Sequence, residues 1–272
     1  MIAIKRLGFG LFVGLDLWIS LCLAALALFM NRVSDFPIQT DAAMLVFFST
    51  LVVYNLDHIR DGAYVSGLHK IFRLITILIA SGMTIRLVHI APVAAQVCFL
   101  IYFLVGCVYS MPLGKGQTKT VRELVGRLKA VLVASAIMIA AAGLPICWYG
   151  SVPSVSYFLI TMFIFQLVLI AVMFFDVIDE EGCADPKLGS EDFVFTMPHL
   201  VIISLFCAVI AKGLLMQSLI GAEIMAFSAA MFVQLVICVL FTQTEQDDHR
   251  TLGRFLTDGV LCAPLCAHLL LV

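Results

Sequence analysis

The chain has 272 residues, of which 62% are hydrophobic and only 12% are charged, and its mean hydropathy is +1.11. Soluble domains are roughly half apolar and about one quarter charged, so this composition excludes a soluble globular protein. The formal net charge of −2 gives no basic excess that would indicate a nucleic-acid partner. We therefore predict an all-α, polytopic membrane helical bundle.

The apolar stretches give the predicted order of the helices. A transmembrane helix needs about 20 mainly apolar residues, and nine stretches approach that length. We interpret them as nine helices of a single integral-membrane domain that covers residues 1–272. Gly143 and Pro145 lie inside the fifth stretch and predict a bend there. In chain order the stretches are 8–30, 41–56, 71–91, 92–110, 128–149, 156–176, 194–212, 220–242 and 255–272.

The distribution of lysine and arginine predicts the orientation of these helices, because cytoplasmic connections are enriched in both residues. With the N-terminus in the cytoplasm, thirteen of the 16 lysines and arginines fall on the cytoplasmic side. Only Arg32, Arg86 and Lys212 fall on the other side. Arg73 is counted here in the connection that follows the second stretch. We expect a multi-pass protein of a bacterial-type inner membrane.

Two of the predicted cytoplasmic connections are rich in carboxylates. Residues 55–61 (Asn-Leu-Asp-His-Ile-Arg-Asp) follow the second apolar stretch, and residues 174–185 follow the sixth. Asp57 and Asp61 are four residues apart and share one helix face. A single acidic patch at the end of a span is most simply a solvated anchor. Two patches on one side of the membrane, with a basic connection between them, favour a shared site.

The chemistry of these groups indicates a divalent cation and a phosphorylated ligand. Carboxylate oxygens are hard ligands that suit Mg²⁺, which is usually bound through one or two carboxylates together with substrate phosphates. In the second patch, Asp176 shares a helix face with Asp179 and Glu180. The basic connection after the fourth stretch, with Arg60 and Lys187, carries the positive charge that a phosphate group requires.

Asp16 also stands out, because it falls inside the first predicted span, where a charge is costly. The sequence leaves two interpretations open. The side chain either belongs to the site or is a hydrogen-bonded structural acid.

The second acidic patch resembles a motif of the UbiA superfamily of intramembrane prenyltransferases. That family's second motif, D-x-x-D-x-x-G-D, is matched by residues 176–182 (Asp-Val-Ile-Asp-Glu-Glu-Gly). Cys183 stands where the last aspartate of the motif is expected, and Asp185 follows two residues later. Two further segments, 109–112 and 254–259, resemble a Tyr-Ser region and the C-terminal helix of some family members.

The first patch is a weaker match to the family's other motif, N-D-x-x-D-x-x-x-D. Asp57 and Asp61 align with its last two aspartates, whereas Val53 and Tyr54 stand in place of the leading Asn-Asp. Asn55 lies close to that position. The chain therefore resembles a divergent member of the family.

This resemblance implies a transferase that moves a prenyl group from a prenyl diphosphate to a membrane-soluble acceptor, which is an aromatic, quinone-precursor or lipid molecule. It implies Asp57, Asp61, Asp176 and Asp179 as catalytic residues, with Glu180 and Asp185 as further ligands of Mg²⁺. The alternative is a UbiA-like protein without this reaction, which binds or transports an isoprenoid lipid. The residues expected to bind the diphosphate are Asn55, Arg60, Lys115, Lys119, Arg122, Arg127, Lys129 and Lys187.

Overall fold

The structure is a computed structural model that describes residues 16–33, 40–60, 67–109 and 129–150, with parts of 157–172 and 258–269. Within these residues all regular secondary structure is helical, and none of them forms a strand. The chain divides into two compact units, Met1–Pro153 and Ser154–Val272. The expectation of one domain over the whole chain stays a prediction.

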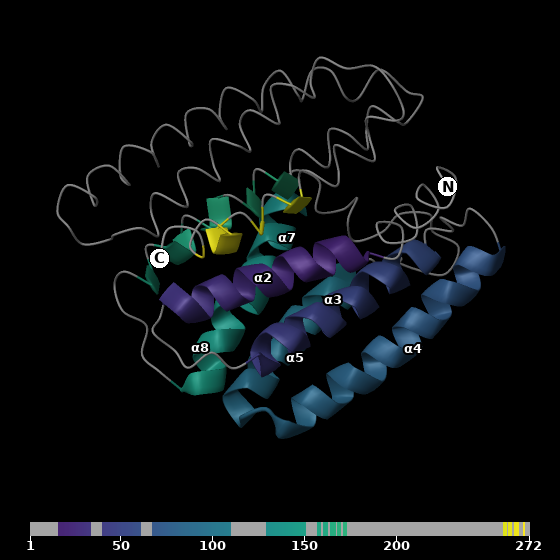
Figure 1. Cartoon of the computed structure of the whole chain (residues 1–272), viewed down its shortest axis with the longest axis horizontal. Coiled ribbons are helices and arrows are strands. Elements are labelled where there is room, and N and C mark those ends of the chain that lie inside the picture. Colours follow the sequence, from purple (N-terminus) through teal and green to yellow (C-terminus); the bar gives the residue numbers. More distant parts are fainter. Residues whose placement is uncertain are drawn as a thin grey trace, which may run out of the picture. The chain divides into compact units, whose positions relative to one another are not determined.

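The described residues of the first unit form four α-helices and one interrupted helix, and Figure 1 shows their arrangement. The interrupted helix consists of two α-helical parts, α7 and α8, which flank a π-helical turn, η2. The elements are α2 (Leu17–Val33), α3 (Asp41–Arg60), α4 (Gly67–Ile90), α5 (Val93–Tyr109), α7 (Lys129–Met138), η2 (Ile139–Gly143) and α8 (Leu144–Tyr149).

Helix α3 lies at the centre of the first unit. It packs between α2 and α4 and also contacts α5 (Figure 1). Leu51 and Val52 of α3 form a buried cluster with Ala80 of α4, against which Leu17 of α2 and Phe103 of α5 pack. Burial of these apolar groups places the middle of α3 in the core, while its last turns lead toward the predicted site.

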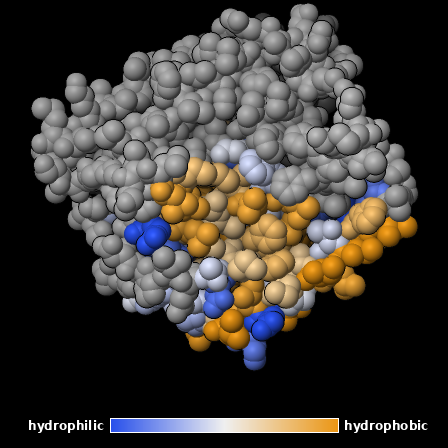
Figure 2. Space-filling model, viewed as in Figure 1, coloured by the Kyte–Doolittle hydropathy of each residue, from blue (hydrophilic) through white to orange (hydrophobic). Residues whose placement is uncertain are grey.

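Much of the surface of the described part is apolar, as expected for helices in contact with lipid. Leu78, Ile79 and Ile85 of α4 and Val93 and Val97 of α5 expose more than half of their surface. Figure 2 shows that hydrophobic side chains cover most of the visible described face, with hydrophilic groups in separate small areas. Exposed apolar faces on this scale mark a surface that contacts a membrane or another protein.

Three of the described helical segments are long and apolar enough to cross a membrane: Asp41–Ile59, His69–Ile90 and Ala130–Tyr149. Two shorter apolar helices cover Leu17–Arg32 and Val93–Val108. These helices identify a membrane protein. The count of nine spans, the orientation and the type of membrane stay predictions.

The observed helix ends correct two of the predicted boundaries. The second span was predicted to end at residue 56, but α3 continues to Arg60, so the first acidic patch begins on the helix and not in a connection. The third span begins at Gly67 and not at residue 71, which places Arg73 inside α4. Helix α2 begins at Leu17, after Asp16, whose φ of 59° gives a left-handed backbone, and positions 8–15 of the predicted first span lie outside the described residues.

Two interruptions of the helices lie where the sequence predicts a boundary or a bend. The break between the third and fourth spans lies at Ala91 and Pro92, where α4 ends and α5 begins. The fifth span contains the π-helical turn η2 directly before Pro145. Proline has no backbone N–H and its ring clashes with the carbonyl four residues earlier, so the regular α-helical hydrogen-bond pattern is interrupted at this point. A π-helical turn accommodates the lost hydrogen bond.

In the second unit, the described positions between 157 and 172 are helical, in agreement with the sixth predicted span. The described positions between 258 and 269 are helical or in a turn. The predicted spans 194–212 and 220–242 lie outside the described residues.

Candidate functional site

Of the residues predicted to form the site, the structure describes those at the end of α3 and at the start of α7. Asp57 and Asn55 lie in the last two turns of α3, Arg60 is the last residue of that helix, and Lys129 is the first residue of α7. The other predicted site residues lie outside the described part of the chain: Asp61, Lys115, Lys119, Arg122, Arg127, Asp176, Asp179, Glu180, Asp185 and Lys187.

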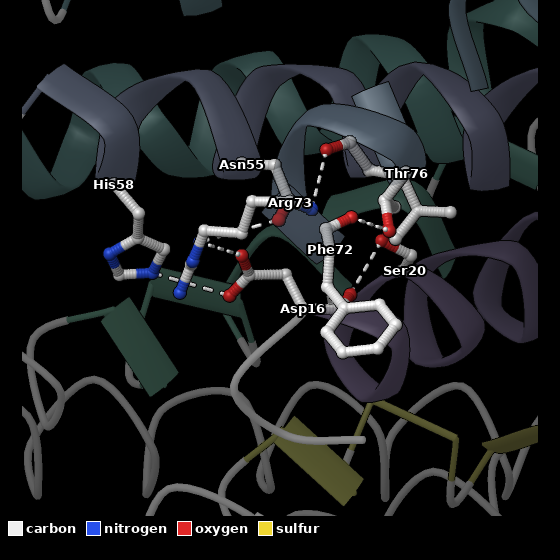
Figure 3. Close-up of polar contacts among 8 residues, drawn as sticks. Asp16, Ser20, Asn55, His58, Phe72, Arg73 and Thr76 are labelled. Carbon is white, nitrogen blue, oxygen red and sulfur yellow. Dashed lines mark hydrogen bonds and ion pairs between the residues drawn. The ribbon is translucent and has the colours of Figure 1, made fainter. Parts of the chain in front are cut away.

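A group of polar and charged side chains, buried except for the partly exposed His58, lies beside this end of α3. It consists of Asp16, Asn55, His58 and Arg73, and we call it the Asp16 cluster. Nη1 of Arg73 lies 3.2 Å from Oδ2 of Asp16 and 3.3 Å from Oδ1 of Asn55. Nε2 of His58 lies 3.3 Å from Oδ1 of Asp16. Figure 3 shows Arg73 and His58 approaching the Asp16 carboxylate, with Asn55 beside Arg73. The cluster therefore joins α3 and α4 to the residue that precedes α2.

The backbone at Asp16 explains how its carboxylate reaches the cluster. The residue has a φ of 59°, a conformation that aspartate adopts more readily than most residues. Its carbonyl oxygen accepts a hydrogen bond from the hydroxyl of Ser20 at 2.8 Å and one from the Ser20 backbone N–H at 3.2 Å. These bonds start α2 immediately after Asp16. A negative charge at the N-terminus of a helix is also favourable for the helix dipole.

Asn55 and His58 reach the cluster because they are three residues apart and lie on the same face of α3. The amide nitrogen of Asn55 donates to the carbonyl oxygen of Leu51 at 2.9 Å, which orients its Oδ1 toward Arg73. Asn55 is completely buried. The role of Asn55 in diphosphate binding stays a prediction, but in this structure its amide group serves the Asp16 cluster.

The electrostatics explain why these residues belong together. Arg73 is 3% exposed and Asp16 is 7% exposed, so both charges are almost completely removed from water. An isolated ion in such a place is very costly, and it is tolerated when an opposite charge and hydrogen bonds accompany it. Asp16 supplies Arg73 with an opposite charge and a hydrogen bond, and Asn55 supplies a second hydrogen bond. Of the two interpretations of Asp16, the structure supports that of a hydrogen-bonded structural acid.

The sequence did not point to Arg73, which was counted among the residues of a cytoplasmic connection. A signal was nevertheless present. A carboxylate expected within a span needs a buried cation as its partner, and Arg73 lies near the start of the third predicted span. His58 belongs to the first acidic patch in the sequence, and its partner Asp16 is too distant along the chain for local spacing to predict the pair.

Asp57 lies on a different side of α3 from Asn55. Successive residues of an α-helix are about 100° apart, so Asp57 shares its face with Val53, one turn earlier. Val53 packs closely against α5, because a Cβ atom added to Gly106 would lie 3.0 Å from Val53 Cγ1. The face that carries Asp57 is therefore the one turned toward the C-terminal part of α5, after which the chain enters the basic segment.

A buried hydrogen bond also connects α3 and α5. The hydroxyl groups of Thr50 and Tyr102 are 3.1 Å apart, and both residues are buried. In an apolar environment such a bond is strong, because the alternative is an unsatisfied hydroxyl. Together with the close contact at Gly106, it holds the Asp57 face of α3 against α5.

The donor set of the two acidic patches fits Mg²⁺ by its chemistry, since all the predicted ligands are carboxylates. In the part of the chain that the structure describes, no group of three or more His, Cys, Asp or Glu side chains is arranged to hold a metal ion. Asp57 is the one predicted ligand inside that part. The metal site therefore stays a prediction.

Comparison with known protein families, curated proteins and solved structures finds no match to this chain.

Proposed function

We propose that this protein is an intramembrane transferase similar to the UbiA superfamily, which moves a prenyl group from a prenyl diphosphate to an aromatic, quinone-precursor or lipid acceptor. The observation that carries the proposal is the position of Asp57. It lies near the end of an apolar helix, on the face turned toward the C-terminal part of α5, from which the chain enters its most basic connection. Acidic and basic groups at one end of a bundle suit a diphosphate with its metal ions.

The proposed reaction transfers an allylic carbon from oxygen to the acceptor. The bond between the prenyl carbon and the diphosphate oxygen breaks, and its electron pair leaves with the diphosphate. The acceptor then forms a bond to the prenyl carbon and releases a proton. Mg²⁺, when bound, would stabilise the charge that develops on the leaving diphosphate. Its proposed ligands are Asp57, Asp61, Asp176, Asp179, Glu180 and Asp185.

Basic residues have a separate role in this proposal. Arg60, Lys129 and Lys187, with the cations of residues 115–127, bind the diphosphate oxygens and contribute to electrostatic stabilisation of the transition state. The Asp16 cluster has a positioning role. It fixes the last turns of α3 through Asn55 and His58 and so holds Asp57 in place, without contact with the reacting atoms.

The test is binding and turnover by the purified full chain in detergent with Mg²⁺. We expect farnesyl or longer prenyl diphosphates to bind, and Asp57→Ala and Asp176→Ala each to weaken binding at least tenfold. The matched control is Asp41→Ala, which removes a carboxylate from the opposite end of the same helix and should bind like the unchanged protein. The metal–diphosphate site is wrong if no prenyl diphosphate binds, or if both site variants bind normally.

A second function has one observation in its favour. Asn55 is the polar residue closest to the position of the missing Asn-Asp pair, and its amide group is taken up by Leu51 and Arg73. This favours a protein that keeps the family's architecture but binds or transports an isoprenoid lipid without transfer. The two functions differ in one measurement. The transferase releases diphosphate when an acceptor is added, and the binding protein does not.

A further inference from the structure

A groove lies between α3, α4 and α5, away from the Asp16 cluster. Its volume is about 570 Å³, which is within the usual range for small-molecule sites. Val52 of α3 and Phe99 and Phe103 of α5 form an apolar lining. The rings of Phe99 and Phe103 are stacked, with their centroids 5.5 Å apart. The groove therefore offers flat apolar surface to a ligand.

The hydroxyl of Thr84 is the unusual feature of this groove. Thr84 is 6% exposed, and its Oγ1 has no hydrogen-bond partner among the described residues. Several other serine and threonine hydroxyls in the described helices donate to a carbonyl oxygen one turn earlier. Thr76 of the same helix donates to the Phe72 carbonyl at 2.9 Å (Figure 3), and Ser135 donates to the Val131 carbonyl at 2.7 Å. A buried hydroxyl without a partner costs free energy, which a ligand oxygen would recover.

The surroundings define the chemistry of such a ligand. The groove is lined by no Lys, Arg, Asp or Glu, and its one ionisable lining residue, His89, is exposed, so a ligand with a net charge would be poorly accommodated in the apolar part. Ile85 lines the groove and is 70% exposed, so the groove opens on the lipid-facing side of α4. A ligand can therefore enter from the hydrocarbon region of the bilayer.

At one end of the groove, the side chain of Gln96 in α5 is hydrogen-bonded to the backbone at the end of α4. Its amide nitrogen donates to the carbonyl oxygens of Val88 and Ala91, at 3.1 Å and 3.0 Å, which ties the first turn of α5 to the end of α4. The groove is thus formed by elements held together without a ligand, and a preformed site binds with a smaller entropic cost.

We propose that this groove binds one lipid without net charge, whose ester carbonyl or hydroxyl group hydrogen-bonds to Thr84 and whose hydrocarbon part packs on Phe99 and Phe103. Thr84 lies 11 residues after Arg73, or about 16 Å along the axis of α4. The site is therefore separate from the Asp16 cluster, and it does not depend on the proposed transferase reaction. The same oxygen chemistry is present in a diacylglycerol and in the glycerol ester region of phosphatidylcholine.

The experiment uses the purified full chain in detergent and two photoactivatable lipids, a diacylglycerol and a phosphatidylcholine, each with a diazirine in one acyl chain. Peptides labelled after irradiation are identified by mass spectrometry, with and without an excess of the unlabelled lipid. We expect labelling of the peptides that contain Val52 and Phe99, reduced at least fivefold by the unlabelled lipid. The lipid that labels these peptides at the lower concentration is the one whose oxygen is taken to hydrogen-bond to Thr84.

Matched variants separate this site from general lipid contact. Thr84→Val keeps the shape of the side chain but removes its hydroxyl, and should lower competable labelling at least fivefold, while Thr84→Ser should retain it. Thr76→Val removes a hydroxyl from the same helix and should label like the unchanged protein. Ser81→Phe fills the groove from α4 and should abolish competable labelling, which keeps the test decisive if Thr84→Val does not fold. Labelling that no unlabelled lipid reduces, or that survives in both Thr84→Val and Ser81→Phe, would overturn the proposal.

Discussion

The buried ion pair between Asp16 and Arg73 makes a quantitative prediction about stability. Two single variants, Asp16→Asn and Arg73→Met, each remove one charge, and the double variant removes both. The two residues are 57 positions apart in sequence, and their charged atoms are 3.2 Å apart in the structure. The pair should therefore determine how α4 is held against the start of α2.

The expected magnitude follows from burial. Removing one partner of a buried ion pair typically costs about 3–5 kcal/mol, because the other charge stays in a place without water. Asp16→Asn should lower the free energy of unfolding more than Arg73→Met, because it removes the carboxylate that both Arg73 and His58 contact. Arg73→Met leaves His58 at 3.3 Å from the carboxylate and should cost nearer the lower value. In the double variant neither charge is left, so its loss should be smaller than the sum of the single losses by about 2 kcal/mol or more.

The measurement is reversible unfolding of the detergent-solubilised chain by sodium dodecyl sulfate. Trp18, two residues after Asp16, and Trp148 in α8 are the two tryptophans of the chain and report the transition through their fluorescence. Arg86→Met is the matched control for Arg73→Met, because Arg86 is on the same helix and is exposed. Its effect should stay within about 0.5 kcal/mol.

Two results would refute this reasoning. If the losses of the two single variants simply add in the double variant, Asp16 and Arg73 are not coupled. If Arg86→Met costs as much as Arg73→Met, the loss reflects a change in helix charge or packing and not a buried pair.

Three further predictions concern the packing of α3, α4, α5 and α8, and the same unfolding measurement checks each. Gly106→Ala should lower the free energy of unfolding by about 1–3 kcal/mol, because the added Cβ would lie 3.0 Å from Val53 Cγ1. Adding Val53→Ala to the same chain should recover most of that loss. If it recovers none, the contact with Val53 is not the cause. Gly150→Ala should lower the free energy of unfolding by about 1 kcal/mol, because Gly150 ends α8 with a φ of 65°. Gly82→Ala is the control: it lies inside α4, its added methyl group also meets no neighbouring atom, and the substitution should be neutral or stabilising. Tyr102→Phe should cost about 1 kcal/mol through loss of the buried hydroxyl that joins α5 to α3, and an unchanged stability would show that this bond contributes nothing.

The relation of sequence to site is clearest on α3. The sequence predicted a helix from Asp41, and α3 begins there. The sequence placed the end of the apolar span at residue 56 and assumed a shared helix face for Asp57 and Asp61, and α3 is indeed helical to Arg60. Contacts with Asp16 and Arg73, which are distant in sequence, satisfy Asn55 and His58 and allow the helix to continue.

The sequence by itself determined the class of the protein and the interruptions of its helices. A chain that is 62% hydrophobic cannot remain in water as a globular domain, and the effects of Pro92 and Pro145 on the backbone are local. Tertiary structure decided which polar groups meet. Helices that are apolar on most sides give no periodic stripe that would indicate their inward face. The pairing of Asp16 with Arg73, the burial of Asn55 and the direction of the Asp57 face follow from packing between distant segments.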